Sequence, residues 1–489
     1  MTLSRRTALK LMSVGAVTMF TGHVRAAQNG LVTRRSLTNM SIDDPAISAY
    51  RDFVGLMQSP QGLPANVNWL AFSQQHGDRI RGYKYCPHGD WYFLPWHRAY
   101  TLMYEKAVQT LTHHSEFAMP YWNWTEVRDY PEAFANPEYR GKPNPLYVPN
   151  RNKLVGKYAL DEYIVGQSVM DQIYSETIYE IFGTSRNPNQ TDTDPKWVVM
   201  GGGSQGILES TPHNLVHNNI GAFMPTPGSP RDPLFFMHHG NIDRIWATWN
   251  ALGRENSNDP LWLGMTFPSN YIKPDGTLYS ANVKELQNIN DLGYTYDYLP
   301  SPDGRTPNTN RESRILALLH SRPGAAVAGV QRFGGANTFA ATPLKALDRQ
   351  WTMSDAAIKS LTAANGGGTE VLALIQDIKI GEHVTAFRVF VNRPDVTESV
   401  PNTDPHYVRT IAFLDHTGGH ADTDAHGMAG QKQLPSVVVN LTGTLQRLYG
   451  SRRLEAGKVS IQLVPVPAAG VALEAVGTVV PASLEIVVL

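Results

Sequence analysis

The sequence predicts a mainly α-helical domain followed by an all-β C-terminal domain. Up to about residue 340, apolar residues recur at spacings of three and four, which is the period of an α-helix. Beyond it, short β-branched segments with alternating apolar residues are separated by turn residues, as in a sandwich or barrel. A chain of 489 residues is also too long for one ordinary core. We therefore expect two domains, at 27–340 and 341–489.

Two segments of the first domain have a clear helical period. They are Thr101–Leu111 and Asp232–Leu252. Helix starts are predicted where an N-cap residue precedes proline, at Thr211-Pro212 and Asp232-Pro233, and Pro95 is expected to open the helix that carries His97.

The second domain is predicted from six short apolar segments. They read TEVLALIQDIKI, AFRVFV, YVRTIAFL, SVVVNLTGTL, KVSIQLVPV and SLEIVVL. The stretches PSPDGRTPNTNRES and AANGGGTE are rich in turn residues and are expected to be loops or linkers. The result is a predicted C-terminal β-sandwich.

The first 26 residues have the features of a twin-arginine export signal. Arg5 and Arg6 precede an apolar run at Leu11–Phe20, and small residues allow cleavage after Ala26. The run is too short to span a bilayer as a mature helix. We expect an exported protein, periplasmic or secreted.

Composition excludes several kinds of partner. The formal net charge is −1 and no long basic run is present, so neither nucleic acid nor an anionic membrane surface is expected as a partner. Cys86 is the only cysteine, which excludes an intrachain disulfide. A homo-oligomer is compatible with the sequence, which does not determine the oligomeric state.

Histidines occur in pairs that suit a metal. His213 and His217 are four residues apart, so on a helix both point to one side. Asn214 stands where a zinc protease would have its general-base glutamate, which argues against that class. Of the adjacent His238 and His239, only one can share a given metal on a helix, and we favour His239.

The surroundings of His239 and His238 are also predicted. Asp243, one turn beyond His239, is expected to orient it, and Phe235, one turn before, to wall the site. His238 is expected to bond instead to backbone or to neighbouring side chains.

A second group lies upstream. Gly89 and Pro95 suggest that His88 sits in a loop and His97 in a first helical turn, and His76 supplies a third neutral donor. Two clusters of three imidazoles without nearby carboxylates suit copper or zinc. Redox copper would explain Cys86, whose thiol can be oxidised and joined to His88; otherwise it is a small buried apolar residue.

Four motifs resemble the type 3 copper family of tyrosinases, catechol oxidases and molluscan haemocyanins. They are HGDWYFLPWHRAY, MPYWNW, PHNLVHNNIG and RDPLFFMHHGNIDRIW, and their order and spacing match across about Trp69–Trp249. Asn123 departs mildly from the pattern, since aspartate is commoner there. AFRVFVNRP resembles the β-domain that follows the catalytic domain in plant polyphenol oxidases. The overall likeness is greatest to bacterial tyrosinases of the Ralstonia and Burkholderia type.

The resemblance implies a catalytic helical bundle that holds a dinuclear copper site. One copper ion would be held by His76, His88 and His97, and the other by His213, His217 and His239. O2 is the implied co-substrate, and small phenols are hydroxylated ortho or oxidised as o-diphenols to o-quinones. Glu209 and Asn214 are implied to hold a water that deprotonates the phenol, and Cys86 and His88 to form a thioether.

Three alternatives remain open at this point. A catechol oxidase would lack useful monophenol hydroxylation, and a haemocyanin-like carrier would bind O2 reversibly without forming quinone. A dinuclear zinc hydrolase is disfavoured because no carboxylate lies in the ligand motifs.

The C-terminal loop HTGGHADTDAHG adds His416, His420 and His426, either as a solvated loop or as part of a lid or copper-loading device.

Overall fold

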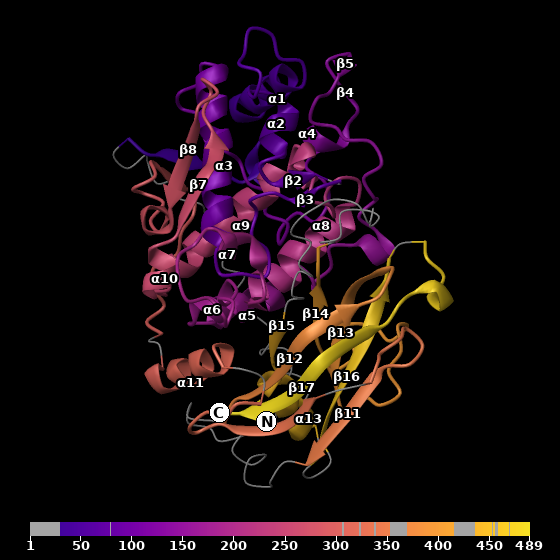
Figure 1. Ribbon diagram of the computed structural model, residues 1–489. Helices are drawn as coiled ribbons and strands as arrows, with labels where there is room; N and C mark the ends of the chain where they lie inside the picture. Colours follow the sequence, from indigo (N-terminus) through magenta and orange to yellow (C-terminus); the bar gives the residue numbers. More distant parts are fainter. Residues whose placement is uncertain are drawn as a thin grey trace, which may run out of the picture.

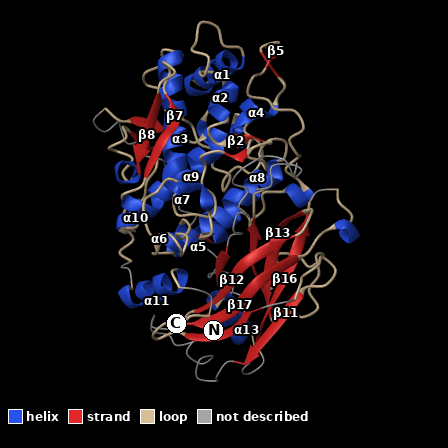
Figure 2. Cartoon of the chain, viewed as in Figure 1, coloured by secondary structure: helices blue, strands red, loops and turns tan. Residues whose placement is uncertain are grey.

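The computed structural model describes residues 30–78, 80–305, 308–321, 324–336, 339–352, 369–414, 436–451, 453–454, 458–468 and 470–489. The helical part lies at one end of the molecule and the strands of the C-terminal part at the other (Figures 1 and 2). The predicted export signal, and the loop with His416, His420 and His426, lie outside the described residues. The predicted order of a helical part before a β-rich part is confirmed.

Two long helices, α3 (Phe93–Leu111) and α9 (Leu234–Ala251), pack against each other at the centre of the helical part. Shorter helices surround them: α1 (Pro45–Gln58), α2 (Trp69–Ser73), α4 (Glu132–Ala135), α5 (Gln167–Ser175), α6 (Tyr179–Phe182), α7 (Lys196–Met200), α8 (Asn214–Ile220), α10 (Pro260–Leu263) and α11 (Thr309–Leu319). Single turns of 3-10 helix are η2 (Leu37–Asn39), η3 (Gly156–Tyr158), η5 (Ser229–Arg231) and η6 (Val283–Leu286). The core between them is rich in buried tryptophan, including Trp91, Trp96, Trp122, Trp124 and Trp246.

Within the described residues, four small two-stranded sheets lie among these helices. They are β1 (Val32–Arg34) with β9 (Tyr294–Tyr296), β2 (Gly77–Asp78) with β3 (Gly82–Tyr83), β4 (Glu138–Tyr139) with β5 (Lys142–Pro143), and β7 (Thr266–Ile272) with β8 (Leu278–Asn282). The β1–β9 pair is parallel and the other three pairs are antiparallel.

The predicted helix starts are only partly correct. The N-cap position of α9 is Pro233 and not Asp232, although Asp232 Oδ1 accepts a hydrogen bond from the Leu234 N–H at 2.9 Å. Pro95 lies two residues inside α3, which begins at Phe93. Pro212 lies inside η4 (Glu209–His213), a π-helical turn, instead of opening a helix. Proline has no N–H to give to the fourth residue before it, so the wider turn is a physical consequence of its presence.

Two sheets form the C-terminal part. The five-stranded sheet has the order β10 (Gln331–Ala336), β17 (Val479–Val488), β12 (Val371–Ile380), β15 (Ser436–Asn440) and β6 (Ser204–Gln205). The four-stranded sheet has the order β11 (Leu347–Thr352), β16 (Lys458–Pro467), β13 (Val384–Val391) and β14 (Tyr407–Ala412). Both sheets contribute to one core, with Ile375 and Leu484 from the first and Phe387 and Ile461 from the second.

This part is β-rich, but the all-β prediction is wrong in detail. The second half of SVVVNLTGTL forms helix α13 (Thr442–Gly450), where Leu445 and Leu448 are buried three residues apart, and η7 (Leu473–Ala475) is a 3-10 turn. Part of the expected loop PSPDGRTPNTNRES is the start of α11. β10 begins before residue 340, and β6 belongs to the helical part of the sequence, so the larger sheet joins both parts of the chain.

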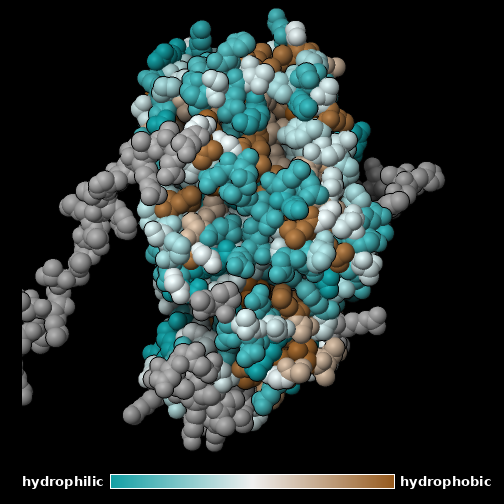
Figure 3. Space-filling view, turned by 90° about the vertical axis from the view of Figure 1, so that its left-hand side faces the viewer, coloured by the Kyte–Doolittle hydropathy of each residue, from teal (hydrophilic) through white to brown (hydrophobic). Residues whose placement is uncertain are grey.

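No helix in the described part of the chain is long and apolar enough to cross a membrane. Figure 3 shows one side of the surface, where hydrophobic residues form separate patches among hydrophilic ones. No single apolar face dominates that side.

Candidate metal centre

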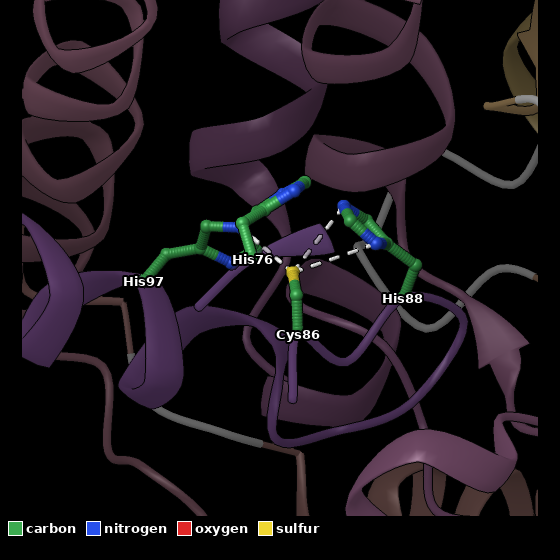
Figure 4. A group of neighbouring side chains, drawn as sticks. All are labelled: His76, Cys86, His88 and His97. Carbon is green, nitrogen blue, oxygen red and sulfur yellow. Dashed lines mark hydrogen bonds between the residues drawn. The ribbon is translucent and has the colours of Figure 1, made fainter. Parts of the chain in front are cut away.

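The first histidine group lies at the buried end of the loop between α2 and α3. Its members are His76, Cys86, His88 and His97, and one nitrogen or sulfur atom of each lies within 4.8 Å of the others. Figure 4 shows the three rings gathered around the Cys86 sulfur. The structure thus brings together the three upstream histidines predicted from the sequence, including His76, for which the sequence gave the weakest signal.

Backbone carbonyls fix the tautomers of two of these rings. His76 Nδ1 lies 2.6 Å from the Pro227 carbonyl oxygen, and His97 Nδ1 lies 2.8 Å from that of Phe93. A carbonyl only accepts, so each Nδ1 carries the proton and each Nε2 keeps a lone pair for a metal. Burial lowers the pKa of His97 to about 3, which keeps its ring neutral at neutral pH.

The Cys86 sulfur contacts two of the rings without a covalent bond. Sγ lies 3.6 Å from His88 Nδ1 and 3.9 Å from His88 Nε2, and it is closer to His97 Nε2, at 3.2 Å. These are non-bonded distances (Figure 4). The structure therefore gives no support for the predicted thioether, although it places the thiol beside His88.

The second group is carried by η4, α8 and α9. It contains His213, His217, His238 and His239, all buried, with one ring nitrogen of each within 4.8 Å of the others. His239 Nε2 lies 3.3 Å from both His213 Nε2 and His217 Nε2. His217 Nδ1 lies 2.7 Å from the Met224 carbonyl oxygen, and His213 Nδ1 donates to Asn214 Oδ1 at 2.8 Å. The lone pairs of both partner rings therefore face His239.

His238 differs from His239 in its partners. Its Nδ1 accepts a hydrogen bond from Trp124 Nε1 at 3.2 Å, as expected for a histidine that bonds to a neighbouring side chain. His238 Nε2 and His239 Nδ1 have no hydrogen-bond partner among the described residues. Three Nε2 atoms therefore meet at His239, while His238 lies in the same group of four histidines.

The predicted role of Asp243 is wrong. Its carboxylate accepts hydrogen bonds from Arg98 Nε at 2.5 Å, from Arg34 Nη1 at 3.0 Å and from the hydroxyls of Tyr294 and Tyr296. It does not bond to His239 Nδ1, which has no hydrogen-bond partner among the described residues. Two buried guanidinium groups attract the carboxylate far more strongly than a neutral imidazole would. They also lower the pKa of Asp243 despite its burial. Phe235 does wall the site, with its ring 4.1 Å from that of His239.

The two groups form one centre. The rings of His97 and His239 are stacked, with centroids 4.3 Å apart, and those of His88 and His213 are 5.7 Å apart. The donor set consists of neutral imidazoles, with a thiol beside the first group, and suits copper. Burial also lowers the pKa of His217, to about 4. The ring nitrogens of each group lie within 4.8 Å of one another, and their lone pairs repel each other unless a cation lies between them. The residues therefore fit a pair of metal ions.

Glu209 and Asn214 lie beside this centre. Glu209 Oε1 accepts from the Gly89 N–H at 2.7 Å and Oε2 accepts from Thr184 Oγ1 at 2.6 Å, so Glu209 ties η4 to the loop that carries His88. Asn214 Nδ2 donates to the Ala412 carbonyl oxygen of β14 at 2.8 Å. Asn214 thus links His213 to the C-terminal part. Sequence reasoning missed this contact, because nothing in the local pattern indicates which strand covers α8.

Comparisons with known proteins agree with this geometry. Residues 48–198 and 152–252 match the family model described as the common central domain of tyrosinase. This match covers the helical part of the chain, which carries both histidine groups. Homologues in the tyrosinase family are copper oxidases, and this chain carries two histidine-rich groups that can hold a metal.

The matches to known proteins differ in how much of each chain they cover. Tyrosinase HcTyr1 of Hahella sp. (strain CCB-MM4) is 25% identical over 78% of this chain and 79% of its own length. Polyphenol oxidase A1 of Vicia faba is 29% identical over 47% of this chain and 41% of its own, so the chain spans less than half of that plant protein. The structure of latent apple tyrosinase has the same fold, with a TM-score of 0.63 at 19% identity over 95% of this chain and 98% of that one.

Proposed function

We propose that the chain is a tyrosinase that hydroxylates monophenols such as tyrosine and oxidises o-diphenols to o-quinones with O2. The observation that carries the proposal is the pair of buried, facing histidine groups, whose Nε2 atoms converge at His239. The name of the Hahella relative, a tyrosinase, supports the same activity. The likeness to bacterial tyrosinases of the Ralstonia and Burkholderia type stays a prediction.

In this proposal the two copper ions are held by one set of three histidines each. The first set is His76, His88 and His97, and the second is His213, His217 and His239. Bound copper supplies the redox chemistry that activates O2 toward a phenol. The chain's contribution is to keep the imidazoles neutral by burial and to aim their Nε2 atoms inward through carbonyls and Asn214.

Glu209 and Asn214 are the proposed residues for phenol deprotonation. The Glu209 carboxylate accepts hydrogen bonds from the Gly89 N–H, Thr184 Oγ1 and Gln205 Nε2, which hold it beside His88 and His213. Asn214 uses one amide hydrogen for Ala412 and retains a second. A general base close to its substrate contributes about 10²–10⁴-fold. The proposed thioether of Cys86 and His88 would fix the orientation of that ring.

Oxidation of tyrosine without a catechol primer is the experiment that tests this proposal. A tyrosinase consumes O2 with tyrosine and with catechol, a catechol oxidase with catechol only, and a carrier forms no quinone with either. In a tyrosinase, Glu209→Gln should depress tyrosine hydroxylation more than catechol oxidation. Equal losses on both substrates would assign Glu209 to the fold instead.

The export route and cellular location also remain proposals. The paired Arg5 and Arg6 before an apolar run support a twin-arginine signal that is cleaved after Ala26. N-terminal sequencing of the protein from the producing cell tests this directly. A mature chain that begins at Ala27 is expected, and an intact N-terminus in the cytoplasm would contradict it.

A further inference from the structure

A cavity of about 410 Å³ lies between the helical part and the C-terminal part, away from the histidines. Its walls include Tyr163 and Ile207 from the helical part and Tyr407, Arg409 and Val438 from the C-terminal strands. Its volume falls in the range of about 300–1,000 Å³ that is typical of small-molecule sites. Both parts of the chain therefore build one pocket that the proposed reaction does not use.

Arg409, on β14, is the unusual residue of this pocket. It is only 6% exposed, and no ion pair joins it to a carboxylate among the described residues. Its Nη2 donates to the Val438 carbonyl oxygen at 3.2 Å, and its Nε has no hydrogen-bond partner. A buried cation without a counter-charge is costly.

Four other arginines with largely buried side chains have their charge balanced by carboxylates or by several carbonyl oxygens. Arg34 pairs with Glu105, Arg151 pairs with Asp232, and Arg311, which also lines the pocket, pairs with Glu176 and Glu370. Arg388 has no carboxylate partner either, but its guanidinium donates to the carbonyl oxygens of residues 397, 398 and 400. Arg409 differs from all of these because it lines the cavity and has no carboxylate partner among the described residues.

We propose that this pocket is a second binding site, and that it takes a small aromatic carboxylate whose charge pairs with Arg409. The pocket's charge favours an anion, since Glu176 and Glu370 are neutralised in part by Arg311 while Arg409 and Arg447 have no acidic partner among the described residues. The rings of Tyr163 and Tyr407 meet edge to face, with centroids 5.6 Å apart, and offer an aromatic wall to the organic part of the ligand.

Occupancy of the pocket bears on how the two parts of the chain hold together. The ligand contacts residues of both parts of the chain, so its binding stabilises the packing of one part on the other by RT ln(1 + [L]/Kd). Arg409 also neighbours Thr410, whose carbonyl oxygen accepts from Thr211 Oγ1 of η4 at 3.2 Å. The pocket and the histidine centre therefore share strand β14, and the inference does not depend on which phenol is oxidised.

Calorimetric titration of the copper-loaded full chain with 2-naphthoate tests the proposal. Arg409→Gln removes the cation and should weaken binding by at least about tenfold, as expected for a lost charge-assisted hydrogen bond. Gly443→Phe fills the pocket instead: Gly443 lines it, and a Cβ there meets no atom within 4 Å. This variant should fold normally and lose binding.

Two matched controls keep the outcome interpretable. Gly450→Phe changes a glycine of the same helix that also has open space but does not line the pocket, and Arg388→Gln removes a buried arginine elsewhere in the domain. Both should bind the probe like the parent chain, and the neutral 2-naphthamide should bind the parent at least about tenfold more weakly. Equal binding by the parent, Arg409→Gln and Gly443→Phe would show that the probe binds outside this pocket and would overturn the proposal. Lack of saturable binding to the parent would overturn it as well.

Discussion

Asn214 connects the histidine centre to the C-terminal part, and its removal should damage both. The residue is fully buried, accepts from His213 Nδ1 at 2.8 Å and donates to the Ala412 carbonyl oxygen at 2.8 Å. Asn214→Ala leaves the His213 N–H and the Ala412 carbonyl without their partners inside the protein. The His213 ring then has no fixed orientation.

The structure sets the size of both effects. An unsatisfied buried polar group costs about 1–3 kcal/mol, so two such groups should lower the free energy of unfolding by about 2–6 kcal/mol. Loss of a group that orients a metal-bound histidine weakens metal binding by about 10–100-fold. Asn214→Asp keeps an acceptor for His213 but loses the donor to Ala412. It should therefore retain copper affinity within a few-fold while it loses about 1–3 kcal/mol of stability.

The assay combines chemical denaturation with copper competition against a chelator of known affinity. Asn218→Ala is the matched control. Asn218 Nδ2 also donates to carbonyl oxygens of the C-terminal part, those of Thr385 and Phe413, at 3.2 Å, but this amide group does not orient a histidine ring. It should lower stability and leave copper affinity unchanged. If Asn214→Ala and Asn218→Ala weakened copper binding equally, the orienting role of Asn214 would be refuted.

Three further predictions follow from the same geometry. His239→Ala should lose about one of two copper ions and nearly all oxidation while His238→Ala keeps both, as measured by metal analysis; the reverse pattern would exchange their roles. If Cys86 is joined to His88 in the active enzyme, the denatured protein should resist alkylation and its mass should be two hydrogens lower, whereas complete alkylation would exclude the thioether. Burial lowers the pKa of His97 to about 3 and that of His217 to about 4, so the unfolded chain, with histidine near 6.5, binds protons first as the pH falls. The free energy of unfolding of the copper-free protein should therefore fall by about 3 kcal/mol per histidine as the pH falls from 6.5 to 4. A free energy of unfolding that stays constant over this pH range in denaturation experiments would contradict the burial of these histidines.

Much of the histidine centre follows from residue spacing. His213 and His217 are four apart on consecutive helical turns, and the 100° rotation per residue on α9 indicates that only one of the adjacent His238 and His239 can share a given metal. These are local rules, so the sequence expresses them directly. The match of the motifs to a known family supplied the upstream set, since a lone histidine such as His76 carries no local signal of its own.

Interactions between distant segments could not be predicted. Asp243 lies one helical turn from His239, but its carboxylate forms an ion pair with Arg34, which is 209 residues away in sequence. The second half of SVVVNLTGTL looks like a strand by its β-branched residues, but its leucines are spaced to bury one face of α13 against the sheet. The cavity at Arg409 likewise depends on how two parts of the chain pack, which no local pattern records.

The central claim is that two facing histidine groups hold two copper ions that oxidise phenols. Metal analysis of the copper-loaded chain, combined with O2 uptake on tyrosine and on catechol, tests it most directly. We expect two copper ions per chain and O2 consumption with both substrates, accompanied by quinone absorbance. A chain that binds zinc in preference to copper, or that binds O2 reversibly without forming quinone, would contradict it.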